Sequence, residues 1–272
     1  MMAGTDADPP ATAMLEFDAE AARQVEAVYL TADVVQQRRD VLRLLALTAD
    51  EAVLDIGSGP GLLATDMAQA VGPTGRVCGI DLSDSMLTLA RGRAMPAGSA
   101  PVEYRHGGVD AVPYPDGCFD VAVSTQVLEY VADIPGALAQ AWRVLRPGGR
   151  LLILDTDWDS IVWHSTDPDR MRRILLTWEQ HLADPFLPRT LGRHLRRAGF
   201  DVPPARVLPL LNIGYQATTF SGREIPVIAR FVVGRDGWTA ADVDSWVEDL
   251  RSLGPDYFFS LNRYIFIATR PQ

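Results

Sequence analysis

The residues best suited to chemistry lie in the stretch 53–61, where a short apolar run that contains Asp55 ends in glycines at 57, 59 and 61. Such a run suits a buried strand of a parallel sheet, and glycines let the backbone turn sharply with no Cβ between it and a ligand. Residues 62–68 continue with apolar side chains at helical spacing. The loop would therefore present the free N–H groups of a helix N-terminus to a bound molecule, which predicts a nucleotide-type crevice.

The elements that must position this loop alternate along the chain. Apolar periodicity and turn residues predict strands at 52–56, 76–80, 102–106, 120–124, 150–155, 202–211 and 257–269. Helices are expected at 62–71, 84–93, 134–144, 167–181, 190–198, 225–233 and 240–250, after a helical N-terminal segment at 17–47. The alternation predicts an α/β fold around a parallel sheet.

The spacing of the glycines narrows the ligand. A dinucleotide fingerprint needs G-x-G-x-x-G, but Leu62 stands where its last glycine would fall, and the observed pattern is D-x-G-x-G-x-G. Asp81 ends the second strand about twenty residues beyond the loop, where an acidic side chain can accept hydrogen bonds from a ribose diol.

Three motifs give a resemblance to a known family. They are D-x-G-x-G-x-G at 55–61, P-Y-P-D-G-x-F-D at 113–120 and R-V-L-R-P-G-G-R-L at 143–151. Over about 53–152 the chain resembles the class I methyltransferases that use S-adenosylmethionine (SAM), and it is most similar to the ubiquinone/menaquinone-type and small-molecule tailoring enzymes. The resemblance implies a doubly wound, Rossmann-like sheet with an antiparallel last strand, N-terminal helices and a helical lid after strand five.

The resemblance also implies a set of cofactor-binding residues. In chain order these are Tyr29, Arg38, Asp55, Gly57, Ser58, Gly59, Gly61, Asp81, Leu82, Met86, Gly108, Val109 and Gln126. Tyr29 and Arg38 would reach the methionine end of SAM, although core packing and a surface charge are the plainer interpretations, and Met86 fits helix core equally well. Gly108 departs from the family, in which an aspartate commonly accepts from the adenine amino group. Either the backbone at Gly108 and Val109 holds the base or Asp110 reaches it.

Methyl transfer needs mainly proximity and alignment, and a general base adds to the rate when the acceptor must lose a proton. His164, Asp157 and Glu129 are the candidate bases. A metal is not expected, because the histidines are scattered along the chain, although carboxylates alternate at 155, 157 and 159.

The composition of the chain indicates which binding partners and which cellular compartment to expect. The net charge is −10, all 25 basic residues are arginine, and no apolar stretch is long enough to span a bilayer. These features argue against nucleic acid and against membrane insertion. Residues 1–13 lack the pattern of a secretory signal and Cys78 and Cys118 are the only cysteines, so a cytoplasmic protein is expected.

The predicted organisation has two parts: residues 1–48 form a flexible tail and a helical cover, and residues 49–272 form a SAM-dependent methyltransferase domain with a lid insertion at about 157–188. The expected activity is methylation of a small organic acceptor, a quinone precursor or a secondary metabolite, on carbon, oxygen or nitrogen. A homodimer is compatible with this organisation. Two alternatives remain open, a noncatalytic or repurposed SAM-fold protein and an NAD-dependent oxidoreductase.

Overall fold

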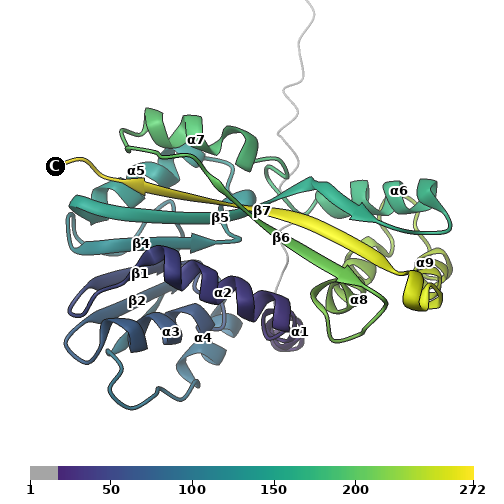
Figure 1. Ribbon diagram of the computed structural model, residues 1–272, viewed down its shortest axis with the longest axis horizontal. Helices are drawn as coiled ribbons and strands as arrows, with labels where there is room; N and C mark the ends of the chain where they lie inside the picture. The colour runs from purple at the N-terminus through teal and green to yellow at the C-terminus, as the bar shows by residue number, and fades with distance from the viewer. Residues whose placement is uncertain (1–17) are drawn as a thin grey trace, which may run out of the picture.

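The computed structural model describes residues 18–272, which form one seven-stranded sheet in the order β3-β2-β1-β4-β5-β7-β6 (Figure 1). The expected N-terminal tail lies largely outside the described residues. Among those that are described, no helix combines the length and the apolar character needed to cross a membrane.

The strands are β1 (Ala52–Ile56), β2 (Arg76–Asp81), β3 (Val102–His106), β4 (Phe119–Thr125), β5 (Leu145–Trp163), β6 (Arg206–Ile213) and β7 (Phe258–Thr269). The helices are α1 (Ala19–Tyr29), α2 (Ala32–Leu45), α3 (Leu62–Val71), α4 (Asp84–Arg91), α5 (Ile134–Val144), α6 (Pro168–Glu179), α7 (Pro188–Arg197), α8 (Phe220–Val232) and α9 (Ala240–Ser252), with short 3₁₀ turns η1 (Leu128–Tyr130) and η2 (Gly254–Asp256).

The pairing of the strands confirms the predicted fold class. Strands β1 to β5 pair in parallel, whereas β7 is antiparallel to both of its neighbours, β5 and β6. Because the strand order reverses between β1 and β4, a crevice opens outside their carboxyl ends, where ligands bind in open α/β sheets.

Apolar helix faces cover both sides of the parallel sheet. Helices α5 and α7 pack on one face, with Leu138 and Leu191 among the buried residues, and α2 and α3 pack on the other face through Val41 and Met67 (Figure 1). A separate aromatic core lies between the extended ends of β5, β6 and β7 and the helices α6, α8 and α9, and it includes Trp178, Trp246 and Phe259.

Strand β5 is the main departure from the predicted elements, because it covers 19 residues instead of the expected 150–155. The extension contains Asp157 and Asp159, which the sequence analysis placed beyond the carboxyl end of the strand. The structure keeps these residues in the strand because β7 pairs with both ends of the extension, across an irregularity between Asp157 and Val162. Helix α8 also starts earlier than expected, at Phe220, because the Thr219 side chain accepts a hydrogen bond from the Gly222 amide and caps the helix.

Candidate functional site

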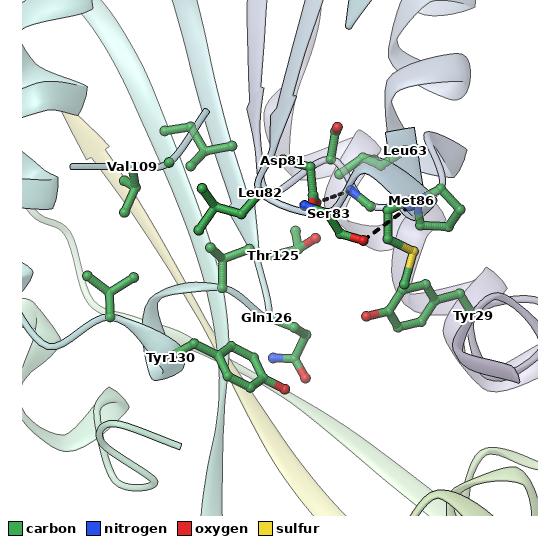
Figure 2. Close-up of a pocket in the computed structure, with 18 of the residues that line it drawn as sticks. Tyr29, Leu63, Asp81, Leu82, Ser83, Met86, Val109, Thr125, Gln126 and Tyr130 are labelled. Atoms are coloured by element: carbon green, nitrogen blue, oxygen red, sulfur yellow. Dashed lines mark hydrogen bonds between the residues drawn. The ribbon is translucent and has the colours of Figure 1, made fainter. Parts of the chain in front are cut away.

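A cavity of about 960 Å³ lies at the carboxyl ends of β1, β2 and β4 (Figure 2). Its wall comes from the glycine loop, the turns after β2, β3 and β4, and helices α1 and α2. Ligand pockets commonly have volumes of about 300–1,000 Å³, so this one has room for a nucleotide-sized cofactor and a second small molecule. Two predicted elements, the glycine loop and the N-terminal helices, therefore meet at one site.

The glycine loop is shaped by close approach of other parts of the chain. Gly57, Gly59 and Gly61 have φ values of 68°, 51° and 75°, in the left-handed region. A Cβ at Gly57 would clash with the side chain of Val127, whereas a Cβ at Gly59 would have only the Tyr29 ring near it, at 3.9 Å. Gly57 is thus needed for packing, and Gly59 turns its open side to the cavity.

Asp81 lies at the mouth of the loop with its carboxylate oriented by two backbone amides. Gly59 N donates to Oδ2 at 2.8 Å and Ser83 N donates to Oδ1 at 2.8 Å (Figure 2 draws the first bond). Burial raises the pKa of this carboxyl. A carboxylate has about four acceptor positions, so Asp81 keeps acceptor capacity for a ligand hydroxyl.

One part of the cavity has apolar walls that suit the flat ring of a nucleobase. Leu82, Met86 and Val109 line it, with Leu82 about half exposed and the other two buried. The Asp110 side chain folds back against Gly108. A Cβ added at Gly108 would clash with Asp110 Oδ1 and would lie 3.3 Å from Leu82 Cδ2. Asp110 also lines the cavity. Both the backbone at Gly108 and the Asp110 carboxylate can therefore contact a bound nucleobase.

A further part of the cavity wall, which we call the inner end, is formed by Tyr29, Gln37, Gln126 and Tyr130. Figure 2 shows the hydroxyls of Tyr29 and Tyr130 turned toward the space beside Gln126. Burial raises the pKa of both tyrosines. Arg38 also lines the cavity, but two of its donors are used within the fold: Nε donates to Asp66 at 3.0 Å and NH1 donates to the Tyr29 carbonyl at 3.0 Å.

Most of the predicted cofactor residues therefore line one cavity, and two do not. Asp55 is buried in β1 beneath the loop, with Oδ2 unpartnered among the described residues, and burial together with the nearby Asp81 raises its pKa to about 8. Gly61 begins α3 against Ala90 and the Tyr104 ring. Ser58 does line the cavity, and its hydroxyl has no partner within residues 18–272.

None of the three candidate bases lines the cavity. His164 is exposed just beyond the end of β5, where its amide donates to Phe258 O. Asp157 is paired with Arg189, and Glu129 accepts from Thr156 N at 3.0 Å and from Trp158 Nε1 at 3.3 Å. Burial raises the pKa of Glu129 to about 7. The structure therefore does not bring these three residues together.

The segment 157–188, expected as a lid, also contributes no residue to the cavity wall. Its apolar stripe, which includes Met171, Ile174 and Trp178, packs into the aromatic core. Helices α1 and α2, by contrast, contribute residues to the cavity wall.

Sequence reasoning missed two charged residues behind the inner end, Arg263 and Glu224. Both are almost fully buried, at 4% and 9% exposure. The sequence pattern around each of these two residues indicates that its side chain is buried. Arg263 falls between Leu261 and Ile265 on the buried face of a strand, and Glu224 lies four residues from Phe220 and Ile228 on the buried stripe of a helix.

Comparison with known proteins agrees with this geometry. Residues 54–153 match the model of a methyltransferase domain. The chain is 40% identical over 192 residues to an uncharacterized 37.1 kDa protein in transposon TN4556 of Streptomyces fradiae, covering 67% of this chain and 52% of that protein. It is 34% identical over 127 residues to the demethylmenaquinone methyltransferase of Listeria welshimeri, covering 47% and 54%. The chain thus spans about half the length of these curated relatives.

Solved structures show the same fold. A methyltransferase-like protein from Bacillus halodurans has a TM-score of 0.60 at 19% identity, covering 87% of this chain and 100% of its own. Phosphoethanolamine N-methyltransferase 2 of Haemonchus contortus, solved with SAM, has a TM-score of 0.61 at 20% identity, covering 94% and 58%. The [4+2]-cyclase SpnF has a TM-score of 0.54 at 23% identity, covering 88% and 81%. The chain contains a class I SAM-dependent methyltransferase domain, and the cofactor of this domain class is SAM.

Proposed function

We propose that the protein is an enzyme that transfers the methyl group of SAM to a small organic acceptor. The observation that carries this proposal is the carboxylate of Asp81, which the amides of Gly59 and Ser83 orient at the edge of a 960 Å³ cavity. The open side of Gly59 fits a polar ligand chain that runs along the loop.

The cavity residues divide between the parts of the cofactor. Asp81 would accept from the ribose diol, Leu82, Met86 and Val109 would contact the adenine, and Asp110 or the Gly108 backbone would accept from its amino group. The glycine loop and Gln126 would hold the methionine portion. When bound, SAM supplies a sulfonium-activated methyl carbon, and the chain's own contribution is to align an acceptor with it and to exclude water.

The acceptor is proposed to be a quinone precursor or a secondary metabolite. Support comes from the demethylmenaquinone methyltransferase relatives and from apolar cavity residues such as Val34, Val41 and Val131, which suit an organic ring. We place the reaction in the cytoplasm, because Cys78 and Cys118 are free thiols, as is usual in a reducing compartment.

Calorimetry with the purified chain tests the cofactor assignment. SAM should bind with micromolar or tighter affinity and NADH should not bind, because Leu62 removes the last glycine of a dinucleotide fingerprint. Binding of NADH without SAM would overturn the proposal and would favour the oxidoreductase alternative.

The second candidate function is a protein that keeps the SAM-binding fold but does not transfer a methyl group. The [4+2]-cyclase SpnF, which has the same fold, favours this candidate. Tritium transfer from methyl-labelled SAM to a broad acceptor panel separates the two. SAM binding with no transfer to any acceptor would favour the repurposed protein.

A further inference from the structure

One hydrogen bond fixes the orientation of the Gln37 side chain in the wall of the inner end. Arg263 NH1 donates to Gln37 Oε1, and because a guanidinium has donors but no acceptor, the amide oxygen must face the arginine. Gln37 Nε2 has no hydrogen-bond partner within residues 18–272 and keeps some accessible surface, although the residue as a whole is only 8% exposed. Since Gln37 lines the cavity, its N–H donors are available to a ligand there.

The same arginine orients the second amide of the inner end through a threonine. Arg263 Nε donates to Thr156 Oγ1 at 3.3 Å, and the Thr156 hydroxyl donates to Gln126 Oε1 at 2.7 Å. The reversed amide would place its oxygen against the Leu154 carbonyl oxygen, which lies 3.5 Å from Nε2. An amide nitrogen carries two N–H groups, so Gln126 also keeps a donor for a ligand.

The backbone of Gln126 supports a functional role for this residue. Its φ is 57°, in the left-handed region that non-glycine residues rarely adopt. Strained residues of this kind concentrate at ligand sites. The strain therefore holds the Gln126 side chain where the cavity and the Thr156 hydroxyl meet.

Two tyrosine hydroxyls complete the inner end. Figure 2 shows the hydroxyls of Tyr29 and Tyr130 turned toward the space beside Gln126. Neither hydroxyl has a hydrogen-bond partner in the part of the chain that the structure describes, and each keeps accessible surface. Burial raises the pKa of both side chains, so they stay protonated at neutral pH and can donate. The inner end is thus a set of neutral hydrogen-bond donors.

The charges near the inner end are already balanced. Burial lowers the pKa of Arg263, and the carboxylates of Glu129 and Glu224 behind the wall raise it. Arg38, which does line the cavity, is paired with Asp66 at 3.0 Å. A carboxylate ligand would therefore lose its hydration in the inner end without gaining a free counter-ion, which costs more than burying a neutral group.

This set of donors discriminates between classes of ligand. A carbonyl oxygen has two lone pairs and can accept from an amide and a hydroxyl together, whereas an amine would meet amide N–H groups that cannot accept from it. Val34 and Val41 lie on the same face of α2 as Gln37, one turn to either side, and they also line the cavity. The surroundings of the Gln37 amide therefore suit a carbonyl group on an apolar ring.

We propose that the inner end is the acceptor subsite, that it takes a neutral organic acceptor through a carbonyl oxygen, as in a quinone or an aryl ketone, and that Gln37 is its specificity-determining donor. Arg263 is a positioning residue, because it orients both amides. The inner end adjoins the site proposed for the methionine portion of SAM, since Gln126 belongs to both. This inference rests on the proposed methyltransferase function.

The test measures binding of matched ligands to the full chain saturated with S-adenosylhomocysteine, so no turnover is needed. In 4-ethylanisole two hydrogens replace the carbonyl oxygen of 4′-methoxyacetophenone, and 4-methoxybenzoate carries a carboxylate instead of the ketone. Calorimetry should show that the ketone binds about tenfold more tightly than either of the other two ligands, because a ligand without a neutral carbonyl leaves the donors unpaired or remains uncompensated itself.

The variant Gln37→Glu tests the donor. One carboxylate oxygen can keep the hydrogen bond from Arg263, while the other replaces the N–H donors by an acceptor. The affinity for the ketone should fall by about tenfold, whereas the affinities for 4-ethylanisole and for S-adenosylhomocysteine should not change. Gln36→Glu, at an exposed position of the same helix, is the matched control and should leave all of these affinities as they are in the wild type.

The variant Arg263→Met tests the positioning role. Without the arginine the Gln37 amide can rotate, so the preference for the ketone over 4-ethylanisole should shrink. The infrared carbonyl stretch of the bound ketone, isotope-labelled at that group, should move to higher wavenumber, and Arg251→Met, at an exposed position of α9, should cause no such shift. Thermal melting verifies that each variant is folded, and Gln37→Glu decides the test if Arg263→Met is not.

The outcomes separate the two proposals. A chain that binds neither SAM nor S-adenosylhomocysteine overturns the methyltransferase function itself. A chain that binds the cofactor but binds the ketone no better than 4-ethylanisole, or binds 4-methoxybenzoate better, overturns the acceptor inference alone. Loss of S-adenosylhomocysteine affinity in Gln37→Glu, with ketone affinity unchanged, would assign these donors to the cofactor carboxylate and also overturns it. A ketone preference that Gln37→Glu removes at unchanged cofactor affinity supports it.

Discussion

The carboxylate of Asp157 forms a two-pronged ion pair with Arg189, in which Nε lies 2.8 Å from Oδ2 and NH2 lies 2.9 Å from Oδ1. Asp157 is buried, whereas about half of the Arg189 side chain is exposed. The ion pair links α7 to the outer part of β5. Because both carboxylate oxygens of Asp157 accept hydrogen bonds from Arg189, we do not expect Asp157 to act as a base.

Asp157→Asn should therefore weaken the fold and leave catalysis intact. Hydrogen bonds to charged groups contribute about 1.5–3 kcal/mol, so urea denaturation should show a loss of roughly this size in the free energy of unfolding. Asp159→Asn is the control, because this exposed carboxylate contacts the same arginine and should cost less. A tenfold loss of kcat at unchanged stability would return Asp157 to the candidate bases.

Replacing Gly57 with alanine should damage both the fold and the cofactor site, because the new Cβ clashes with Val127 and the φ of 68° is strained for any other residue. Gly98→Ala isolates the strain, since Gly98 has a φ of 78° with no atom near its Cβ position. We expect Gly57→Ala to cost about 1–3 kcal/mol more than Gly98→Ala, as measured by chemical denaturation. The double variant Gly57→Ala, Val127→Ala should recover part of the difference, and equal costs for the two single variants would contradict the packing argument.

Asp81→Ala should weaken SAM binding by roughly 10- to 100-fold, because it removes a charged acceptor and releases the amides of Gly59 and Ser83. Isothermal titration calorimetry measures the change, with Asp244→Ala on the exposed face of α9 as the control. Unchanged affinity in Asp81→Ala would refute the assigned ribose contact.

The stability of the protein should fall in mild acid because of His181. Its ring is fully buried, stacks 3.7 Å from the Trp178 ring and has Nε2 unpartnered within the described chain. Burial lowers its pKa from 6.5 to about 4, so between these values the unfolded chain takes up a proton that the folded chain does not. Unfolding free energy should drop by up to about 3 kcal/mol as the pH falls from 6.5 to 4.

Denaturation curves at several pH values measure this slope in the wild type and in His181→Gln, where it should flatten. His194→Gln, at a partly exposed position of α7, should keep the wild-type slope. If the slope survives in His181→Gln, other groups cause it.

Most of the residues predicted to bind the cofactor line one cavity, and the sequence could group them because their signals are local. The glycines at 57, 59 and 61, the strand before them and Asp81 follow one another within about thirty residues, and their spacing alone fixes the turn. Helices and strands with clear apolar periodicity, such as β1, α3 and α5, begin and end where their patterns predict.

The buried contacts behind the inner end were not predictable in the same way, because their residues come together only through tertiary structure. Gln37, Thr156, Glu224 and Arg263 lie on four different elements, and each carries no motif of its own. The absence of the three candidate bases from the cavity wall has a related reason. His164, Asp157 and Glu129 were chosen by residue type near strand ends, and whether such a side chain faces a cavity or an ion pair depends on packing that spacing does not encode.

Strand β5 carries a consequence for motion. It runs from Leu151 in the core shared with α5 and α7 to Trp163 in the aromatic core, and β7 pairs with it on both sides of the irregularity between Asp157 and Val162. Because two antiparallel strands connect the two cores, we expect this pairing to restrict hinge motion between them. We expect a ligand to enter and leave the cavity through local opening of α1 and α2, whose amides should then exchange hydrogen fastest around the cavity.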